Sequence, residues 1–150
     1  MQVVTVTQLI PVLQTAIGPT ILISGIGLLL LSMTNRLGRA IDRARILARE
    51  VPDLADDRRA MVTAQLQILW RRARIIRIAI ALAAMSALSA AILIIVLFIT
   101  ALGQVQTAPL ISVLFIVCMG CLIGSLIAFI HDLNQSLLAL KLELDVHNEP

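Results

Sequence analysis

The sequence predicts an all-α integral membrane protein with three transmembrane helices, and three observations carry this prediction. Hydrophobic residues make up 59% of the 150-residue chain and charged residues only 14%, whereas soluble domains contain roughly 25% charged residues. Three stretches are long and apolar enough to cross a bilayer, at about residues 12–33, 75–102 and 109–130. Eleven of the twelve basic side chains lie in residues 34–78, next to these stretches.

The first span, residues 12–33, contains 22 residues without a charged side chain, and about 20 are needed to cross the hydrocarbon core. Pro19 is expected to kink this helix near its outer end. The helix should continue beyond residue 33, because apolar and arginine side chains both keep a helical spacing there. It should end at Pro52, which disfavours helical geometry in the residue before it.

A second helical pattern runs from about residue 54 to residue 102. This is ~70 Å at 1.5 Å per residue, about twice what a membrane needs, so half of the helix must project from the membrane. Trp70 and the arginines beside it indicate the water–lipid boundary. The projecting half is therefore predicted to form a helical hairpin with the end of the first helix, over residues 34–74.

Pro109 opens the third span, and an amphipathic tail helix is expected over residues 131–147. The segment after residue 130 has a net charge of −3, opposite in sign to the hairpin. Its leucines have the 4-3-4 spacing of a coiled-coil seam, at positions 133, 137, 140 and 144. We expect the tail to pack on the hairpin, because so short a helix is not stable alone in water.

Positive charge beside membrane spans stays on the cytoplasmic side. The arginine-rich hairpin and the C-terminus are therefore predicted to be cytoplasmic and the N-terminus external, with residues 1–150 forming a single membrane domain. Nucleic-acid binding is the alternative explanation for basic clusters, but these clusters flank membrane spans and lack the aromatic side chains that stack on bases. The sequence thus favours the lipid bilayer, and not nucleic acid, as the partner.

No motif in the sequence predicts catalysis, cofactor binding or metal binding, so we expect a protein that is not an enzyme. Cys118 and Cys121 match a redox or metal motif, but they lie within the third span without further ligands nearby, which favours helix packing. Gly120 and Gly124 form a small-residue motif that allows close helix approach, either within the chain or between subunits.

The arginines are the strongest candidates for binding. Guanidinium groups bind carboxylates and phosphates in two-point geometry and stay charged when partly buried. Fixed anionic partners are therefore expected, among them anionic lipid headgroups, Asp42 or the acidic tail. The candidate lipid- or anion-binding residues are Arg36, Arg39, Arg43, Arg71, Arg72 and Arg74.

A face of the first span combines small residues every seven positions with apolar residues between them. It continues in register into the arginines at 36, 39 and 43. In a symmetric ring of subunits it could line a pore, whereas in a single chain it could pack against the second span. The face consists of Gly18, Leu22, Gly25, Leu29 and Ser32.

A polar cluster is expected where the first and third spans leave the membrane, at Asn35, His131 and Asp132. One interpretation is a titratable site or gate. The other is a cap and salt-bridge cluster that ties the third span to the first.

The block from Ser32 to Arg45, SMTNRLGRAIDRAR, resembles the bacterial membrane protein family DUF2721, and the resemblance extends over about residues 9–144. It implies a prokaryotic inner-membrane or thylakoid-type protein with three hydrophobic segments in this arrangement. No catalytic or binding residue is carried over from it.

Two functions are consistent with these features. In the first, the protein is a non-enzymatic homo-oligomer that forms an ion channel or pore, selective for anions if the arginines line its mouth. In the second, it is an accessory or scaffold subunit whose arginine-rich hairpin docks a larger membrane complex or anionic lipid.

Overall fold

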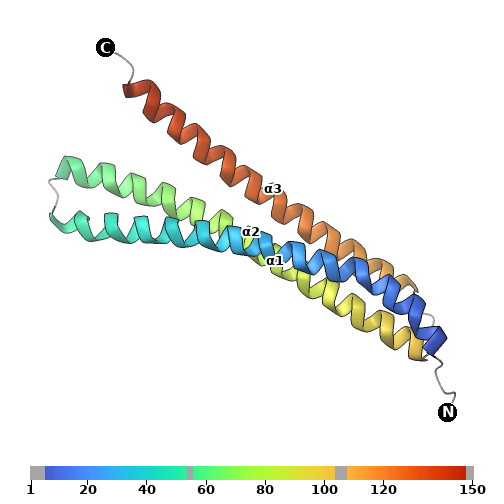
Figure 1. Ribbon diagram of the computed structural model, residues 1–150. Coiled ribbons are helices and arrows are strands. Elements are labelled where there is room, and N and C mark those ends of the chain that lie inside the picture. Colours follow the sequence, from blue (N-terminus) through green and yellow to red (C-terminus); the bar gives the residue numbers. More distant parts are fainter. Residues whose placement is uncertain (1–5, 54–55, 104–107, 148–150) are drawn as a thin grey trace. The chain divides into compact units, whose positions relative to one another are not determined.

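The computed structural model describes residues 6–53, 56–103 and 108–147, with side chains described at positions 10, 11, 13–52, 58–102 and 108–135. Within these residues the chain consists of α1 (Val6–Glu50), the short 3-10 helix η1 (Val51–Asp53), α2 (Asp56–Gly103) and α3 (Ala108–His147) (Figure 1). Each of the three α-helices in the described part is long and apolar enough to cross a membrane. The prediction of an all-helical chain with three helices long and apolar enough to cross a membrane is therefore confirmed.

The helix boundaries follow the local signals in the sequence. α1 continues without a break past residue 33, as expected, and ends at Glu50 directly before the turn that contains Pro52. The Arg59 guanidinium donates a hydrogen bond of 3.3 Å to the backbone carbonyl of Pro52, which links the turn to the beginning of α2. α2 begins at Asp56, close to the start expected near residue 54.

α1 also continues through Pro11 and Pro19. A proline inside a helix removes one backbone donor, and in an apolar environment side-chain hydroxyls can help to satisfy backbone groups. Thr15 and Thr20 each donate a hydrogen bond of 2.8 Å to the carbonyl four residues earlier, of Pro11 and Ala16. These are not the carbonyls that lose a backbone donor at the two prolines, which are four residues before each proline. The kink expected at Pro19 stays a prediction.

The chain forms two compact units, each built from parts of all three helices. The first combines Met1–Leu31 with Ala81–Gly124, and the second combines Ser32–Ile80 with Ser125–Pro150. In the first unit the buried positions of α2 are mostly small, and Ser86 of α2 contacts Cys118 of α3 there. Small side chains allow the two helix backbones to approach closely.

The second unit contains the core cluster Met33, Ile76 and Ala79, all at most 2% exposed, with Phe129 of α3 packed against it. The Ser125 hydroxyl of α3 donates a hydrogen bond of 2.7 Å to the carbonyl of Ala79. In this unit α1 and α2 also run antiparallel side by side up to η1, and they form the hairpin whose faces carry the candidate site (Figure 1).

The tail expected over residues 131–147 is helical, because α3 continues to His147. The side chains of Leu137, Leu140 and Leu144 lie outside the described residues. Packing of the tail on the hairpin therefore stays a prediction.

Candidate functional site

Asp132 is the centre of the candidate site. Its side chain is fully buried, although it is ionisable and close to the end of an apolar stretch. Its Oδ1 accepts a long hydrogen bond from Nε of Arg72 on α2, at 3.5 Å, and its Oδ2 lies 3.8 Å from Nε of Arg36 on α1. One carboxylate of α3 thus pairs with an arginine of each of the other two helices. The pairing offsets the free-energy cost of burying the charge of Asp132.

Arg36 has a second contact in the same unit. Its guanidinium carbon lies 5.5 Å from the ring centroid of Phe129, within the range of a cation–π interaction. Phe129 lies three residues before Asp132, on the neighbouring part of the same helix surface. α3 therefore contacts Arg36 with both a carboxylate and an aromatic face.

The arginines surround a pocket of about 190 Å³, which we call the arginine pocket. Arg39 and Arg43 are exposed, and the side chains of Arg36 and Arg72 are 22% and 26% exposed. Four arginines and one aspartate line the pocket, so it has an excess of positive charge. Its residues are Arg36, Arg39, Ala40, Arg43, Leu69, Arg72, Ile76 and Asp132.

Four of the six candidate lipid- or anion-binding arginines therefore meet in one pocket. The spacing of residues 36, 39 and 43 places these three on one face of α1. Arg71 is exposed and does not line the pocket. Arg74 lies elsewhere too, with its guanidinium carbon 5.7 Å from the ring centroid of the exposed Trp70.

The three residues of the expected polar cluster, Asn35, His131 and Asp132, differ in burial. Asn35 and His131 are exposed, and Nε2 of His131 lies 3.0 Å from Nε2 of Gln135 on the same helix. Only Asp132 is buried against the hairpin, and its ion pair with Arg36 is a salt bridge between α3 and α1. The ion pair thus matches the salt-bridge interpretation for Asp132. His131 is instead beside Gln135 on its own helix.

The small residues of the face on α1 are not covered by the described part of the chain. Gly18, Gly25 and Ser32 are exposed, and a Cβ atom added at either glycine would meet no described atom within 4 Å. Leu22 and Leu29 are half-buried. The small residues of this face therefore do not pack against α2.

The two cysteines of α3 are free thiols and differ in burial. Cys118 is buried, whereas Cys121 is half-buried. The Ser86 hydroxyl donates a hydrogen bond of 2.8 Å to the backbone carbonyl of Cys118, and the Cys118 thiol donates one of 3.3 Å to the backbone carbonyl of Ser86. Among the described residues, no three histidine, cysteine or acidic side chains cluster in a way that could hold a metal ion. Cys118 contributes to helix packing, as the sequence favoured.

The two glycines of the third span also differ. An added Cβ at Gly124 would lie 3.4 Å from Cδ1 of Leu82, in ordinary contact, while one at Gly120 would meet no described atom within 4 Å. Gly124 therefore packs inside the chain and Gly120 is exposed.

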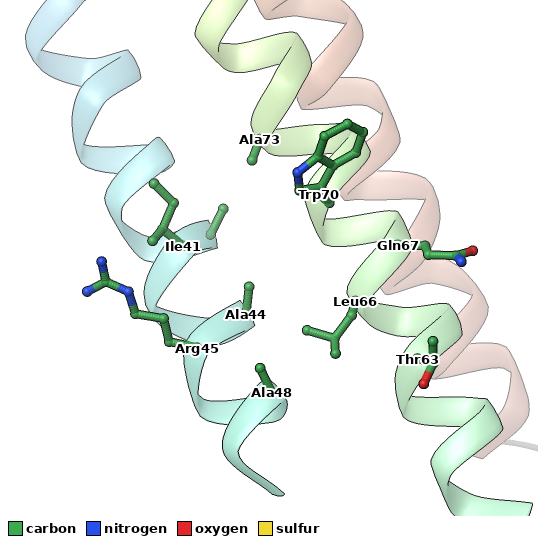
Figure 2. Close-up of a pocket in the computed structure, with 10 residues that line it drawn as sticks. Ile41, Ala44, Arg45, Ala48, Thr63, Leu66, Gln67, Trp70 and Ala73 are labelled. Carbon is green, nitrogen blue, oxygen red and sulfur yellow. The ribbon is translucent and has the colours of Figure 1, made fainter. Parts of the chain in front are cut away.

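A second, larger pocket was not predicted from the sequence. It is a groove of about 540 Å³ between α1 and α2, which we call the hairpin groove (Figure 2). Its lining is mainly apolar, with alanines on α1 and larger side chains on α2. Its lining residues include Ala44, Arg45, Ala48, Leu66, Trp70 and Ala73.

The pairing of Asp132 with Arg72 was also not predicted from the sequence, although the sequence contains a signal for it. Buried polar positions recur every seven residues on α3, at Cys118, Ser125 and Asp132. Their contacts on α2 recur with the same interval in reverse, at Ser86, Ala79 and Arg72. An antiparallel helix pair with a seven-residue repeat produces this pattern.

The lining of the arginine pocket is chemically suited to an anionic group. Its guanidinium groups offer fork-shaped donors that match phosphate oxygens, and Asp132 holds two of them in place. The volume is about six times the ~30 Å³ that a water molecule occupies in the liquid, so a small anionic group fits with some water.

The chain was compared with known proteins and families. Comparison with curated proteins and with solved structures gives no match. The family described as "Protein of unknown function (DUF2721)" matches residues 16–142, which is most of the chain and includes every residue of the arginine pocket. The chain therefore belongs to the DUF2721 family.

Proposed function

We propose that this protein is a non-enzymatic, multi-pass protein of the bacterial inner membrane that binds the phosphate of anionic lipid headgroups in its arginine pocket. The observation that carries the proposal is the meeting of four arginines from two helices around one buried carboxylate. Arg39 and Arg43 are exposed there, with their charges available to a ligand.

The position of the pocket along the chain supports lipid as the source of the phosphate. Arg36 follows the apolar part of α1 within a few residues, and Ile76 of the pocket lies at the start of the second predicted span. In the proposed topology the N-terminus is external and the hairpin and C-terminus are cytoplasmic, which places the pocket at the level of cytoplasmic lipid headgroups.

Replacing both Arg39 and Arg43 with glutamine is expected to weaken binding of anionic lipid by roughly 25-fold, because each surface arginine contributes about 1 kcal/mol. The protein would be placed in nanodiscs of zwitterionic lipid with increasing phosphatidylglycerol, and bound lipid counted by native mass spectrometry. The matched control replaces Arg49 and Arg58, which are exposed on the same hairpin but outside the pocket.

Equal losses in the two double variants would show that the pocket has no special role and would refute the proposal. Inorganic phosphate is added in a separate arm. If millimolar phosphate displaces the lipid completely, the site recognises a soluble anion, and the lipid assignment is wrong.

A second candidate function, a homo-oligomeric anion channel, is favoured by one observation. The face that contains Gly18 and Gly25 stays exposed in the single chain, although small residues allow close helix approach. Assembly of several copies around this face would place Arg39 and Arg43 in rings of positive charge at its cytoplasmic end, and such rings select for anions.

In this second candidate, Arg39→Glu is expected to reduce the chloride-to-potassium permeability ratio of purified protein in liposomes. Chloride flux through the unmodified protein is measured first, with empty liposomes as the control. Absence of flux, or a permeability ratio unchanged by the charge reversal, would remove the channel candidate and leave the lipid-binding proposal standing.

A further inference from the structure

The arginine pocket has more positive than negative charge, and this excess bears on the kind of phosphate that it binds. Among the eight described residues that line it, four are arginines and one is an aspartate, so their formal charges sum to +3. Arginine is not deprotonated in proteins, so the excess persists at every pH of interest. A ligand with a single negative charge leaves most of it uncompensated.

Asp132 offsets one of the positive charges without closing the pocket. Its carboxylate oxygens lie 3.8 Å from Nε of Arg36 and 3.5 Å from Nε of Arg72, longer than the ~2.7–2.9 Å of a close charge-assisted hydrogen bond. Both arginine side chains keep some exposure, whereas Asp132 is fully buried. A ligand that arrives from solvent therefore meets guanidinium groups before it meets the carboxylate.

The positive charges come from both walls of the pocket. Arg36, Arg39 and Arg43 lie within an arc of about 60° on α1, whereas Arg72 belongs to α2. A phosphate monoester has three terminal oxygens that accept hydrogen bonds, and it can present them to both walls. A phosphodiester has two terminal oxygens and a second substituent, which needs space in a pocket of only about 190 Å³.

We propose that the arginine pocket selects a terminal phosphate monoester, the headgroup of phosphatidic acid, over a phosphodiester headgroup. This selectivity rests on the proposed lipid-binding function and specifies its headgroup. A phosphate monoester has a charge of about −1.5 to −2 at pH 7, because its second pKa is about 6. A phosphodiester has a single negative charge, so it gains less from the excess of guanidinium groups.

The openness of the pocket favours the ligand with the larger charge. Removing a doubly charged group from water is costly where the site excludes water. Arg39 and Arg43 are exposed, so the phosphate keeps part of its hydration beside them. The cost of losing water is therefore limited, and the attraction by the arginines decides the preference.

Binding of two lipids with the same acyl chains tests the inference. The full-length protein is placed in nanodiscs of phosphatidylcholine with either phosphatidic acid or phosphatidylglycerol, and bound lipid is counted by native mass spectrometry. We expect at least roughly fivefold tighter binding of phosphatidic acid, because a further charge about 4 Å from a guanidinium gains this factor even at the dielectric constant of water. Equal binding of the two lipids would overturn the inference and leave the proposed function standing, whereas binding of neither would overturn both.

Single arginine variants show whether the preference belongs to the pocket. Arg39→Gln removes one charge of the lining and should lower the ratio of phosphatidic acid to phosphatidylglycerol affinity by up to roughly fivefold. Arg49→Gln is the matched control, because Arg49 is exposed on the same helix outside the pocket, and it should leave the ratio unchanged. Equal ratios in the two variants would assign the preference to general surface charge and overturn the inference.

The preference should also depend on pH. Between about pH 7.5 and about pH 5 the monoester loses its second charge, so the ratio of the two affinities should fall as the pH decreases through about 6. The arginines of α1 and α2 do not titrate in this range. Asp132 and the exposed His131 are the titratable groups on the adjoining part of α3, and a change in either acts on both lipids. A ratio that stays constant over this range would show that the second charge is not recognised, and the inference would fail.

Glycerol phosphate distinguishes a lipid from a soluble monoester as the source of the phosphate. It has the same terminal phosphate without acyl chains, so it should displace phosphatidic acid only at a far higher concentration. If it displaces the lipid at a comparable concentration, selectivity for a monoester stands, but the lipid source and with it the proposed function are wrong.

Discussion

Replacing Asp132 with alanine is expected to destabilise the protein far more than replacing an exposed carboxylate. Removing one partner of a buried ion pair costs roughly 3–5 kcal/mol, because the remaining charge is left without compensation. The side chains of Arg36 and Arg72 are 22% and 26% exposed and can recover part of their hydration. We therefore expect a loss at the lower end of this range.

The free energy of unfolding would be measured by titration with a denaturing detergent, followed by circular dichroism of the helices. Asp42→Ala is the matched control, because Asp42 is exposed on α1. A charge-free variant in which Arg36, Arg72 and Asp132 are all replaced by apolar residues should recover most of the stability. Equal stability of Asp132→Ala and Asp42→Ala would show that the carboxylate does not hold the helices together.

The three long helices and their turn could be predicted from the sequence because each depends on local chemistry. Uncharged runs of about 20 residues specify membrane-spanning length, and a proline specifies where α1 ends. The continuation of α1 past residue 33 followed from the helical spacing of its apolar and arginine side chains. None of these inferences required knowledge of which helix lies next to which.

The candidate site could be predicted only in part, because it depends on contacts between helices. The spacing of Arg36, Arg39 and Arg43 gave one wall of the arginine pocket. The addition of Arg72 depends on the register of α2 against α1 and α3, which helical periodicity alone does not specify. Burial of Asp132 was unexpected for the same reason, since the residue stands at the polar end of an apolar run.

The hairpin groove could not be predicted, because its volume depends on the distance between two helices. The sequence places Ala44 and Ala48 on an apolar stripe of the first helix, but it does not say what the stripe faces, and Trp70 was interpreted as a marker of the membrane boundary. Only the structure shows that Trp70 and the alanines line the same space.

The second large effect is expected from Ala79→Leu, at a buried contact between α2 and α3 in the unit that carries the arginine pocket. Ala79 is fully buried beside Met33 and Ile76, and its carbonyl accepts a hydrogen bond of 2.7 Å from Ser125. Extra methylene groups in a packed core cost typically about 1–3 kcal/mol. Separation of the helices would also weaken the bond from Ser125, and interhelical hydrogen bonds in membranes contribute roughly 0.6–2 kcal/mol.

Ala84→Leu provides the matched control, since Ala84 is exposed on α2 and a leucine there meets lipid or detergent. We expect the same detergent titration to show a loss for Ala79→Leu and no loss for Ala84→Leu. Since Asp132 lies seven residues after Ser125 on α3, the same variant should also weaken lipid binding in the arginine pocket by disturbing the position of that carboxylate. If Ala79→Leu unfolds at the same detergent concentration as Ala84→Leu and binds lipid normally, the contact at Ala79 is looser than the structure indicates. The pocket would then be held by Asp132 and its arginines without support from this part of the core.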